Sequence, residues 1–271
     1  MTQFLDVPGG RLAYELTGPD KGPLVVCAPG MGDVRASYRF LVPALLEAGH
    51  RVATVDLRGH GESSTGWADY SPEAAGADLL ALVRHLGGPA ALIGHSFSPA
   101  PVVWAAAEAP DAVSSITLIA PWVSEPKTSP LLRLAAGVIM RSPTLFAKVF
   151  YPSLYKGGRP DDLAVYTDAM RAKLAEPGRL TALRGVGNAS KANANARMAE
   201  VRCPALVVMG TADPDFPDPA AEARLAQRRL APSAASVTVH LVEGAGHYPH
   251  IERPGEVAPA VVSFLAGAVR A

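Results

Sequence analysis

The sequence is poor in the features that mark disulfide-stabilised, membrane-spanning and nucleic-acid-binding proteins. Only two of its 271 residues are cysteines, Cys27 and Cys203, and each is expected to be a reduced thiol in the core. No uninterrupted apolar run reaches the roughly 18 residues of a transmembrane helix, and residues 1–10 lack the basic and apolar segments of a secretory signal. The formal net charge is +0, which gives no indication of nucleic-acid binding. We therefore expect a cytoplasmic protein with neither a membrane span nor a nucleic-acid partner.

What the sequence does contain is enough apolar material for one sizeable core, with 49% hydrophobic and 18% charged residues. Short apolar runs predict six strands, at 24–28, 52–55, 90–93, 113–119, 205–209 and 236–242. Helical patterns fall between and after them, at 37–48, 72–86, 97–109, 219–230 and 256–269. Strands that alternate with helices indicate a doubly wound α/β fold with a mostly parallel sheet. Two further strands, 2–7 and 11–17, flank Pro8-Gly9-Gly10 and predict an antiparallel hairpin at one edge.

The alternation stops between residues 121 and 199, which carry helical patterns and no convincing strand. Three apolar stripes recur there at helical spacing: Leu131, Leu134 and Val138; Phe146, Val149 and Phe150; and Leu163, Tyr166, Met170 and Leu174. A helical insertion between two strands predicts a lid over the carboxyl ends of the strands, where ligands bind in such folds. We thus divide the chain into an α/β core, 1–120 and 200–271, and a lid, 121–199. Most stripe residues are expected to pack against the core.

The predicted lid is also the basic part of the chain. Residues 121–199 contain twelve lysines and arginines against five aspartates and glutamates, an excess of seven positive charges. Because the whole chain is neutral, the remainder must carry the opposite excess. A positive lid could attract an anionic substrate or an acidic carrier protein. The same charges also fit an ordinary solvated helical surface.

Residues 90–99 predict a strand, a sharp turn and a helix, with Ser96 at the turn. The apolar run ends at Gly94, and Pro99 suits the first turn of a helix, where a missing N–H costs little. A hydroxyl on such a turn projects above the sheet, beside free N–H groups that can hold an oxyanion. Taken alone, the segment also fits any α/β protein, with Ser96 as a helix N-cap. It resembles the G-x-S-x-G nucleophile elbow of the α/β-hydrolase superfamily, with Ser98 in place of the second glycine.

A serine nucleophile needs a base within hydrogen-bond reach, and that base needs an orienting acid. His247 is the candidate base, in a glycine-containing loop after the last predicted strand. Asp213 follows the preceding strand and is the candidate acid, with Asp215 as its alternative. The order serine, aspartate, histidine, each just after a strand, is that of the α/β-hydrolase superfamily. Three other histidines are expected to fill structural, supporting or surface positions: His60, His95 and His250.

The resemblance extends to two further segments. In this superfamily the loop after the strand equivalent to 24–28 supplies one oxyanion donor, and the residue after the nucleophile supplies the other. The donors implied here are the backbone N–H groups of Met31 and Phe97. Pro29 stands where the superfamily usually has histidine, at a position that is not asked to donate. The run 56–63 is similar to the D-x-R-G-x-G-x-S segment of the superfamily, which is chiefly structural.

Together these features predict a serine hydrolase that cleaves an ester, thioester or lactone of a small or medium, partly apolar acyl compound. Carbon–carbon bond hydrolysis, an acyl-transferring cyclisation and a carrier-protein thioesterase are alternatives on the same fold, and a receptor with little turnover is another. No paired metal-ligand spacing or phosphate-binding loop is present, so neither a cofactor nor a metal is expected. The candidates for contacting the substrate under the lid are four aromatic residues, Trp122, Phe146, Phe150 and Tyr166.

Overall fold

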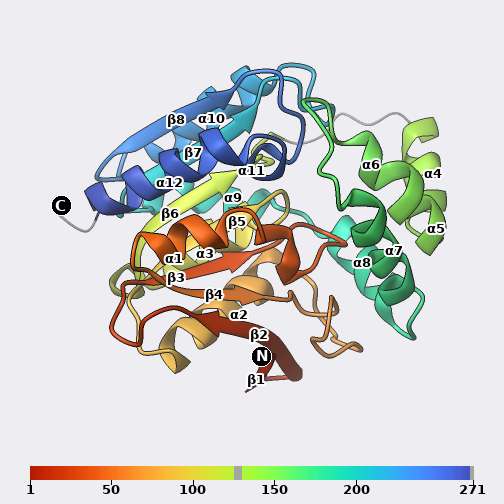
Figure 1. Cartoon of the computed structure of the whole chain (residues 1–271), viewed down its shortest axis with the longest axis horizontal. Coiled ribbons are helices and arrows are strands. Elements are labelled where there is room, and N and C mark those ends of the chain that lie inside the picture. Colours follow the sequence, from red (N-terminus) through yellow and green to blue (C-terminus); the bar gives the residue numbers. More distant parts are fainter. Residues whose placement is uncertain (125–129, 269–271) are drawn as a thin grey trace.

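One eight-stranded sheet carries the molecule (Figure 1). The structure, a computed structural model, describes residues 1–124 and 130–268, and the side chains of these except at 130–133. Its strands lie in the order β1-β2-β4-β3-β5-β6-β7-β8. The β1–β2 and β2–β4 pairs are antiparallel and the other five are parallel. The strands are Gln3–Val7, Gly10–Thr17, Leu24–Ala28, Arg51–Val55, Ala90–His95, Val113–Ile119, Ala205–Gly210 and Val237–Val242. The predicted doubly wound sheet with an edge hairpin is confirmed.

Helices cover both faces of this sheet because its central strands are apolar on both sides. One face packs against α2, α3 and α10, which are Pro72–His85, Pro99–Glu108 and Pro219–Leu230. The other face packs against α1 and α12, which are Val42–Glu47 and Pro254–Ala268. Cys27 is buried in this second layer and Cys203 is half-buried, and both are free thiols as predicted. The short α11, Pro249–Glu252, precedes α12.

A single helix predicted over 37–48 is wrong. The structure has a 3₁₀ turn, Arg35–Tyr38, followed by the shorter α1. Pro43 lies in the first turn of α1. Its ring fixes φ, and it removes the N–H that a continuous helix would need at that position, so the earlier turn cannot run on into α1. The loop between β3 and this turn, residues 29–34, is thereby a separate unit.

Among the described residues between β6 and β7 every regular element is helical, and Figure 1 places most of these residues beyond the ends of β3 and β6. They form α4 to α9, Pro130–Ile139, Pro143–Leu145, Tyr151–Ser153, Leu163–Leu174, Arg179–Asn188 and Ala192–Ala196, with a π-helical turn at Phe146–Phe150 and a 3₁₀ turn at Arg197–Glu200. Leu183 of α8 and Phe146 lie against Gly32 of the loop after β3. This segment therefore covers the end of the sheet that the predicted site occupies.

The apolar stripes of this segment are only partly buried. The stripe on α7 is buried along its whole length, as predicted. The stripe on α4 is not, since Leu134 is 67% exposed and Val138 51% exposed, and Leu131 lies outside the described side chains. Phe146 is buried but Val149 is exposed. The expectation that most stripe residues pack on the core is wrong for α4, because helical periodicity locates an apolar face without locating a surface to cover it.

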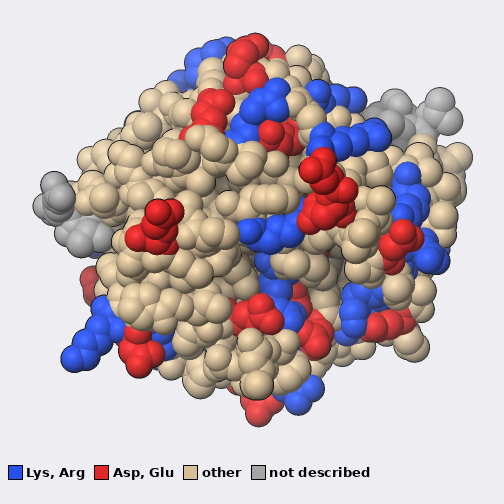
Figure 2. Space-filling view, viewed as in Figure 1, with Lys and Arg blue, Asp and Glu red and all other residues tan. Residues whose placement is uncertain are grey.

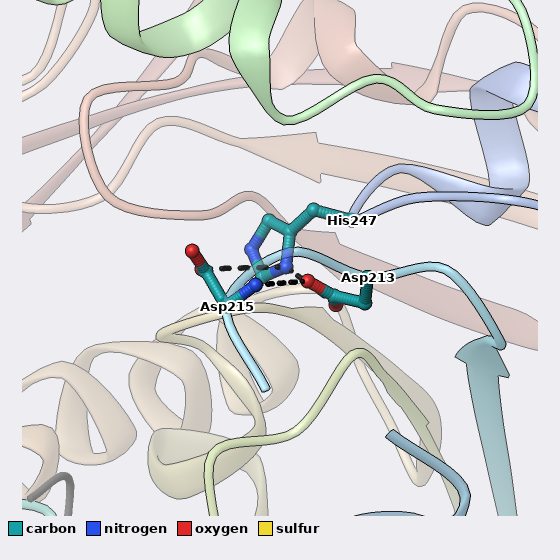
Figure 3. Close-up of side chains that lie close together, drawn as sticks. All are labelled: Asp213, Asp215 and His247. Atoms are coloured by element: carbon teal, nitrogen blue, oxygen red, sulfur yellow. Dashed lines mark hydrogen bonds and ion pairs between the residues drawn. The ribbon is translucent and has the colours of Figure 1, made fainter. Parts of the chain in front are cut away.

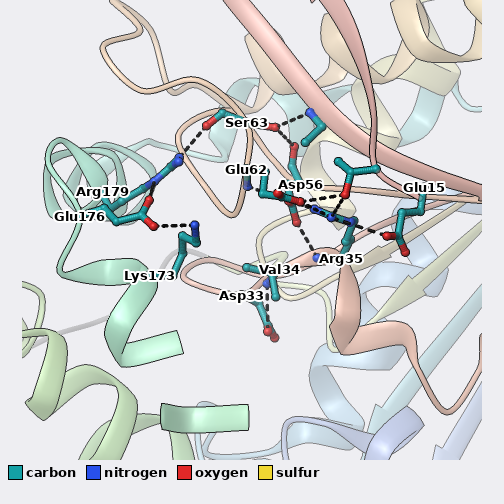
Figure 4. Close-up of polar contacts among 12 residues, drawn as sticks. Glu15, Asp33, Val34, Arg35, Asp56, Glu62, Ser63, Lys173, Glu176 and Arg179 are labelled. Atoms are coloured by element: carbon teal, nitrogen blue, oxygen red, sulfur yellow. Dashed lines mark hydrogen bonds and ion pairs between the residues drawn. The ribbon is translucent and has the colours of Figure 1, made fainter. Parts of the chain in front are cut away.

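The segment 56–63 has the structural role that the resemblance implies (Figure 4). The buried carboxylate of Asp56 accepts hydrogen bonds from the backbone N–H groups of Arg35 and Glu62, at 2.7 and 2.9 Å, and pairs with the Arg35 guanidinium. The Ser63 hydroxyl donates to the Asp56 carbonyl at 2.7 Å. Arg179 of α8 donates to the Ser63 carbonyl at 2.6 Å. This network anchors the helical segment to the core.

Several basic side chains of the helical segment pair with acidic ones. Lys148 pairs with Asp168 at 3.0 Å, and Lys173 and Arg179 both pair with Glu176. The visible face likewise shows basic and acidic side chains interspersed (Figure 2). Over residues 1–124 and 130–268, no helix is long and apolar enough to cross a membrane.

Candidate active site

Ser96 occupies a strained turn between β5 and α3. Its φ is +59°, a left-handed value that is costly for any residue other than glycine. The turn is held by two backbone hydrogen bonds, from the Ser96 N–H to the Ile119 carbonyl and from the Ser98 N–H to the His95 carbonyl, both 2.9 Å. Glycine is required at 94, because a Cβ there would lie 2.7 Å from the Ser98 carbonyl. The residue types at 94–99 therefore build the turn that was predicted.

Two backbone N–H groups near Ser96 have no acceptor among the residues that the structure describes. Within the described residues, neither the Met31 nor the Phe97 N–H has a recorded hydrogen-bond partner. The loop that carries Met31 lies directly against the nucleophile candidate, since a Cβ on Gly30 would come within 3.0 Å of the Ser96 Cβ. A pair of unsatisfied donors flanking a serine is the arrangement that binds a tetrahedral oxyanion.

His247 lies between Ser96 and Asp213. Its Nε2 is 2.8 Å from the Ser96 Oγ, and its Nδ1 is 2.8 Å from the Asp213 Oδ2. A carboxylate can only accept a hydrogen bond, so Nδ1 carries the proton and the Nε2 lone pair faces the serine hydroxyl. The structure thus brings together the three side chains that the sequence singled out, in hydrogen-bond contact and in the orientation of a nucleophile, a base and an orienting acid.

A second carboxylate, that of Asp215, lies beside the same imidazole (Figure 3). Its Oδ2 is 3.5 Å from the His247 Nδ1, and its backbone N–H donates to the Asp213 Oδ1 at 3.0 Å. Burial raises the pKa of Asp215, against the opposing effect of His247. These three residues offer ligand atoms within 4.8 Å of one another, enough to hold a metal ion. The hydrogen bond between Asp213 and His247 already uses the Nδ1 atom that would bind the metal ion, so acid–base chemistry is the better interpretation.

The pKa of His247 sets a pH dependence. Burial lowers it, but the charges of Asp213 and Asp215 prevail and raise it to about 9. Because only the neutral imidazole can accept the Ser96 proton, kcat/KM should rise with pH, reach half its maximum near pH 9 and level off above it. Asp215→Asn removes one of the two charges and should move this rise to lower pH. A pH–rate profile of both proteins checks the prediction, and superimposable profiles would contradict it.

The other three histidines that the sequence singled out lie outside the hydrogen-bonded chain of Ser96, His247 and Asp213. His95 donates from Nε2 to the His247 carbonyl at 2.8 Å and so joins the serine turn to the histidine loop. Burial lowers the pKa of His60 to about 4 and that of His250 to about 3. His250 is buried against the ring of Tyr38, so a surface position for it is wrong. All three fill structural positions in the described molecule.

Glu252 is a residue whose place the sequence analysis missed. Its buried carboxylate accepts hydrogen bonds from four backbone N–H groups, those of Lys156, Gly157, Gly246 and Tyr248, at 2.9, 2.5, 3.0 and 3.1 Å. Two of these flank His247, and the other two belong to the helical segment. Nothing in the sequence signals this, because a glutamate five residues after a histidine has no recognised motif and half of its partners belong to the distant residues 156 and 157.

Asp33 is a second missed residue, in the loop that carries Met31. Its side chain is fully buried, and burial raises its pKa to about 6, against the effect of a hydrogen bond from Tyr166. The hydroxyls of Tyr151 and Tyr166 both contact the carboxylate, the former at 3.3 Å. The predicted substrate residue Tyr166 thus joins the helical segment to the loop after β3.

The remaining aromatic candidates occupy two places. Trp122 lies close enough to the side chain of Asp215 to oppose the rise of its pKa, and so reaches the acid pair. Phe146 packs against the loop after β3, where a Cβ on Gly32 would lie 2.4 Å from its ring. Phe150 packs on Phe146 with ring centroids 5.4 Å apart. Trp122 therefore lies beside the hydrogen-bonded chain of Ser96, His247 and Asp213, whereas the two phenylalanines pack over the loop after β3.

This architecture and the order of the three side chains agree with the comparison of the chain with known families. The profile of the alpha/beta hydrolase family matches residues 25–260. The chain belongs to the α/β hydrolase family. The protein is therefore a hydrolase by family, and its fold is the one that the sequence resemblance implied.

The individual proteins similar to the chain have different activities in their names. The putative carbamate hydrolase RutD of Variovorax paradoxus is 25% identical over 94% of this chain and 96% of its own length. The polyketide synthase ThaQ of Burkholderia thailandensis is 29% identical over 99% of this chain, which spans 13% of that synthase. A thermophilic esterase from Thermogutta terrifontis is 25% identical, with a TM-score of 0.77 over 99% of both chains. These similarities establish the family of the chain but not its substrate.

Proposed function

We propose that the protein is a serine hydrolase that cleaves an ester, thioester or lactone through an acyl-enzyme. The observation that carries this proposal is the hydrogen-bonded chain from Ser96 through His247 to Asp213, with both spacings 2.8 Å. Two unsatisfied N–H groups beside Ser96 support it. No cofactor is needed for such chemistry, since the side chains supply both the nucleophile and the base.

In the proposed mechanism, the Ser96 Oγ attacks the substrate carbonyl carbon while His247 Nε2 takes the hydroxyl proton. The Met31 and Phe97 N–H groups bind the oxyanion of the tetrahedral intermediate. When the intermediate collapses, His247 returns the proton to the leaving oxygen or sulfur. Water then attacks the acyl-enzyme with His247 again as base, releasing the acid and restoring Ser96. Asp213 holds the imidazole tautomer and stabilises its charged form throughout.

The substrate is proposed to be partly apolar, since the wall around the site is aromatic. Trp122, Phe146, Phe150 and Tyr166 are the residues we propose to line it. A carrier-bound thioester is the second candidate, because similarity to the polyketide synthase ThaQ covers 99% of this chain. The excess of seven positive charges over residues 121–199 slightly favours an acidic carrier, so small thioesters and carrier-bound ones need to be compared directly.

Reaction with a fluorophosphonate probe tests the proposal. Labelling of the wild type and its loss in Ser96→Ala are expected, since an activated serine attacks the probe's phosphorus, displaces fluoride and becomes phosphonylated. Turnover of p-nitrophenyl esters across acyl lengths then shows which acyl length the pocket accepts. The rates on matched small-molecule and carrier-bound thioesters compare the two substrate classes. Labelling without turnover of any of these would favour a receptor-like protein, and no labelling at all would refute the serine hydrolase.

A further inference from the structure

Two residues that depart from the superfamily pattern are hydrogen-bonded to each other. Pro29 replaces the usual histidine in the loop after β3, and Ser98 replaces the second glycine of the elbow. The Ser98 Oγ donates to the Pro29 carbonyl at 2.5 Å, and both residues are buried. They are 69 residues apart in the chain. The contact is therefore a tertiary link between the loop of one proposed oxyanion donor and the turn of the other.

This link supplies the hydrogen bond that the Pro29 carbonyl accepts. Among the residues that the structure describes, no backbone N–H donates to it, so the Ser98 hydroxyl alone satisfies a buried acceptor. The same loop approaches the nucleophile closely at Gly30, as described above. Met31 follows directly, and its N–H lacks a partner within the described chain. Any shift of the Pro29–Gly30 peptide would therefore move the Met31 donor relative to Ser96.

We propose that Ser98 is a positioning residue of the oxyanion hole, which fixes the Pro29–Met31 loop by donating to the Pro29 carbonyl. The inference rests on the proposed serine hydrolase function and adds a residue to it. Ser98 touches neither the nucleophile hydroxyl nor the base, so it acts through the loop. Since the oxyanion forms only in the transition state, the loss of this link should lower kcat and leave KM nearly unchanged.

Two variants and a matched control test the proposal. Ser98→Gly restores the superfamily residue and so fits the turn, and Ser98→Ala retains the Cβ; both remove the hydroxyl. Each is expected to lower kcat about 10- to 100-fold with KM within about threefold, because deleting an oxyanion donor outright costs about 10²–10³-fold. Ser37→Ala is the control, since Ser37 is fully buried and its hydroxyl has no partner in the described chain. It should leave kcat unchanged.

A second measurement separates positioning from general damage to the fold. The affinity of a boronic acid that mimics the tetrahedral intermediate should fall in both Ser98 variants by the same factor as kcat, while substrate KM stays constant. Unchanged kcat in folded Ser98→Gly and Ser98→Ala would overturn the proposal. A rise in KM by the same factor as the fall in kcat would overturn it too. If Ser96→Ala keeps full activity, the serine hydrolase function itself fails, which is a distinct result.

Discussion

Replacing Ser96 by alanine is expected to lower kcat/KM by about 10⁵-fold, because the nucleophile of a serine–histidine–aspartate chain acts as a unit with its base. The protein should still fold, since the hydroxyl contacts only His247 among the described side chains. Residual turnover, about 10³–10⁴-fold above the uncatalysed reaction, would come from the oxyanion donors and substrate binding alone. Steady-state kinetics on a p-nitrophenyl ester measure the effect, with circular dichroism as the check on folding.

The backbone at Ser96 supplies a sharper control for this experiment. Ser96→Ala and Ser96→Gly both lack the nucleophile, so their activities should be equally low. Their stabilities should differ, because alanine retains the strain of φ +59° and glycine does not. We expect the free energy of unfolding to be about 1 kcal/mol higher for the glycine variant, as measured by urea denaturation. Wild-type activity in either variant would exclude Ser96 as the nucleophile.

The proximity of Ser96, Asp213 and His247 was predictable because each lies just beyond a strand of one parallel sheet. Parallel strands that follow one another through crossovers bring their carboxyl ends to the same edge. Local sequence decides which residues stand at those ends, and apolar runs mark them clearly. The positions of the strands along the chain, the hairpin and the glycine at 94 could all be predicted for the same reason, since each depends on residues close together in the chain.

What could not be predicted depends on contacts between distant segments. Glu252 holds amides of residues 156 and 157, and Asp33 meets the hydroxyls of Tyr151 and Tyr166. Neither acid has a local pattern that announces a partner about a hundred residues away. The exposed stripe on α4 has the same origin, because an apolar face does not specify what it packs against. The helices of 130–199 therefore shape the site by tertiary contacts that only the structure supplies.

Removing the Asp213 carboxylate is expected to lower kcat/KM, but by less than removing the Ser96 hydroxyl. In Asp213→Ala the imidazole loses its 2.8 Å partner, yet the Asp215 Oδ2 remains 3.5 Å from Nδ1 and can move to accept the same proton. We expect kcat/KM to fall about 10²- to 10³-fold, against the roughly 10⁴-fold cost of losing the orienting acid where no second carboxylate stands by. Asp215→Ala alone should cost about threefold or less, because the shorter hydrogen bond stays in place.

The double variant Asp213→Ala/Asp215→Ala decides whether the two carboxylates share the role. If they do, kcat/KM of the double variant should be a further tenfold or more below that of Asp213→Ala. Its total loss then exceeds the product of the two single losses, as expected for residues that contact one partner. A double variant no worse than Asp213→Ala would show that Asp215 never orients His247. If Asp215→Ala proved the more damaging single change, the acid assignment would pass from Asp213 to Asp215, and the Ser98 and Ser96 predictions would stand unaltered.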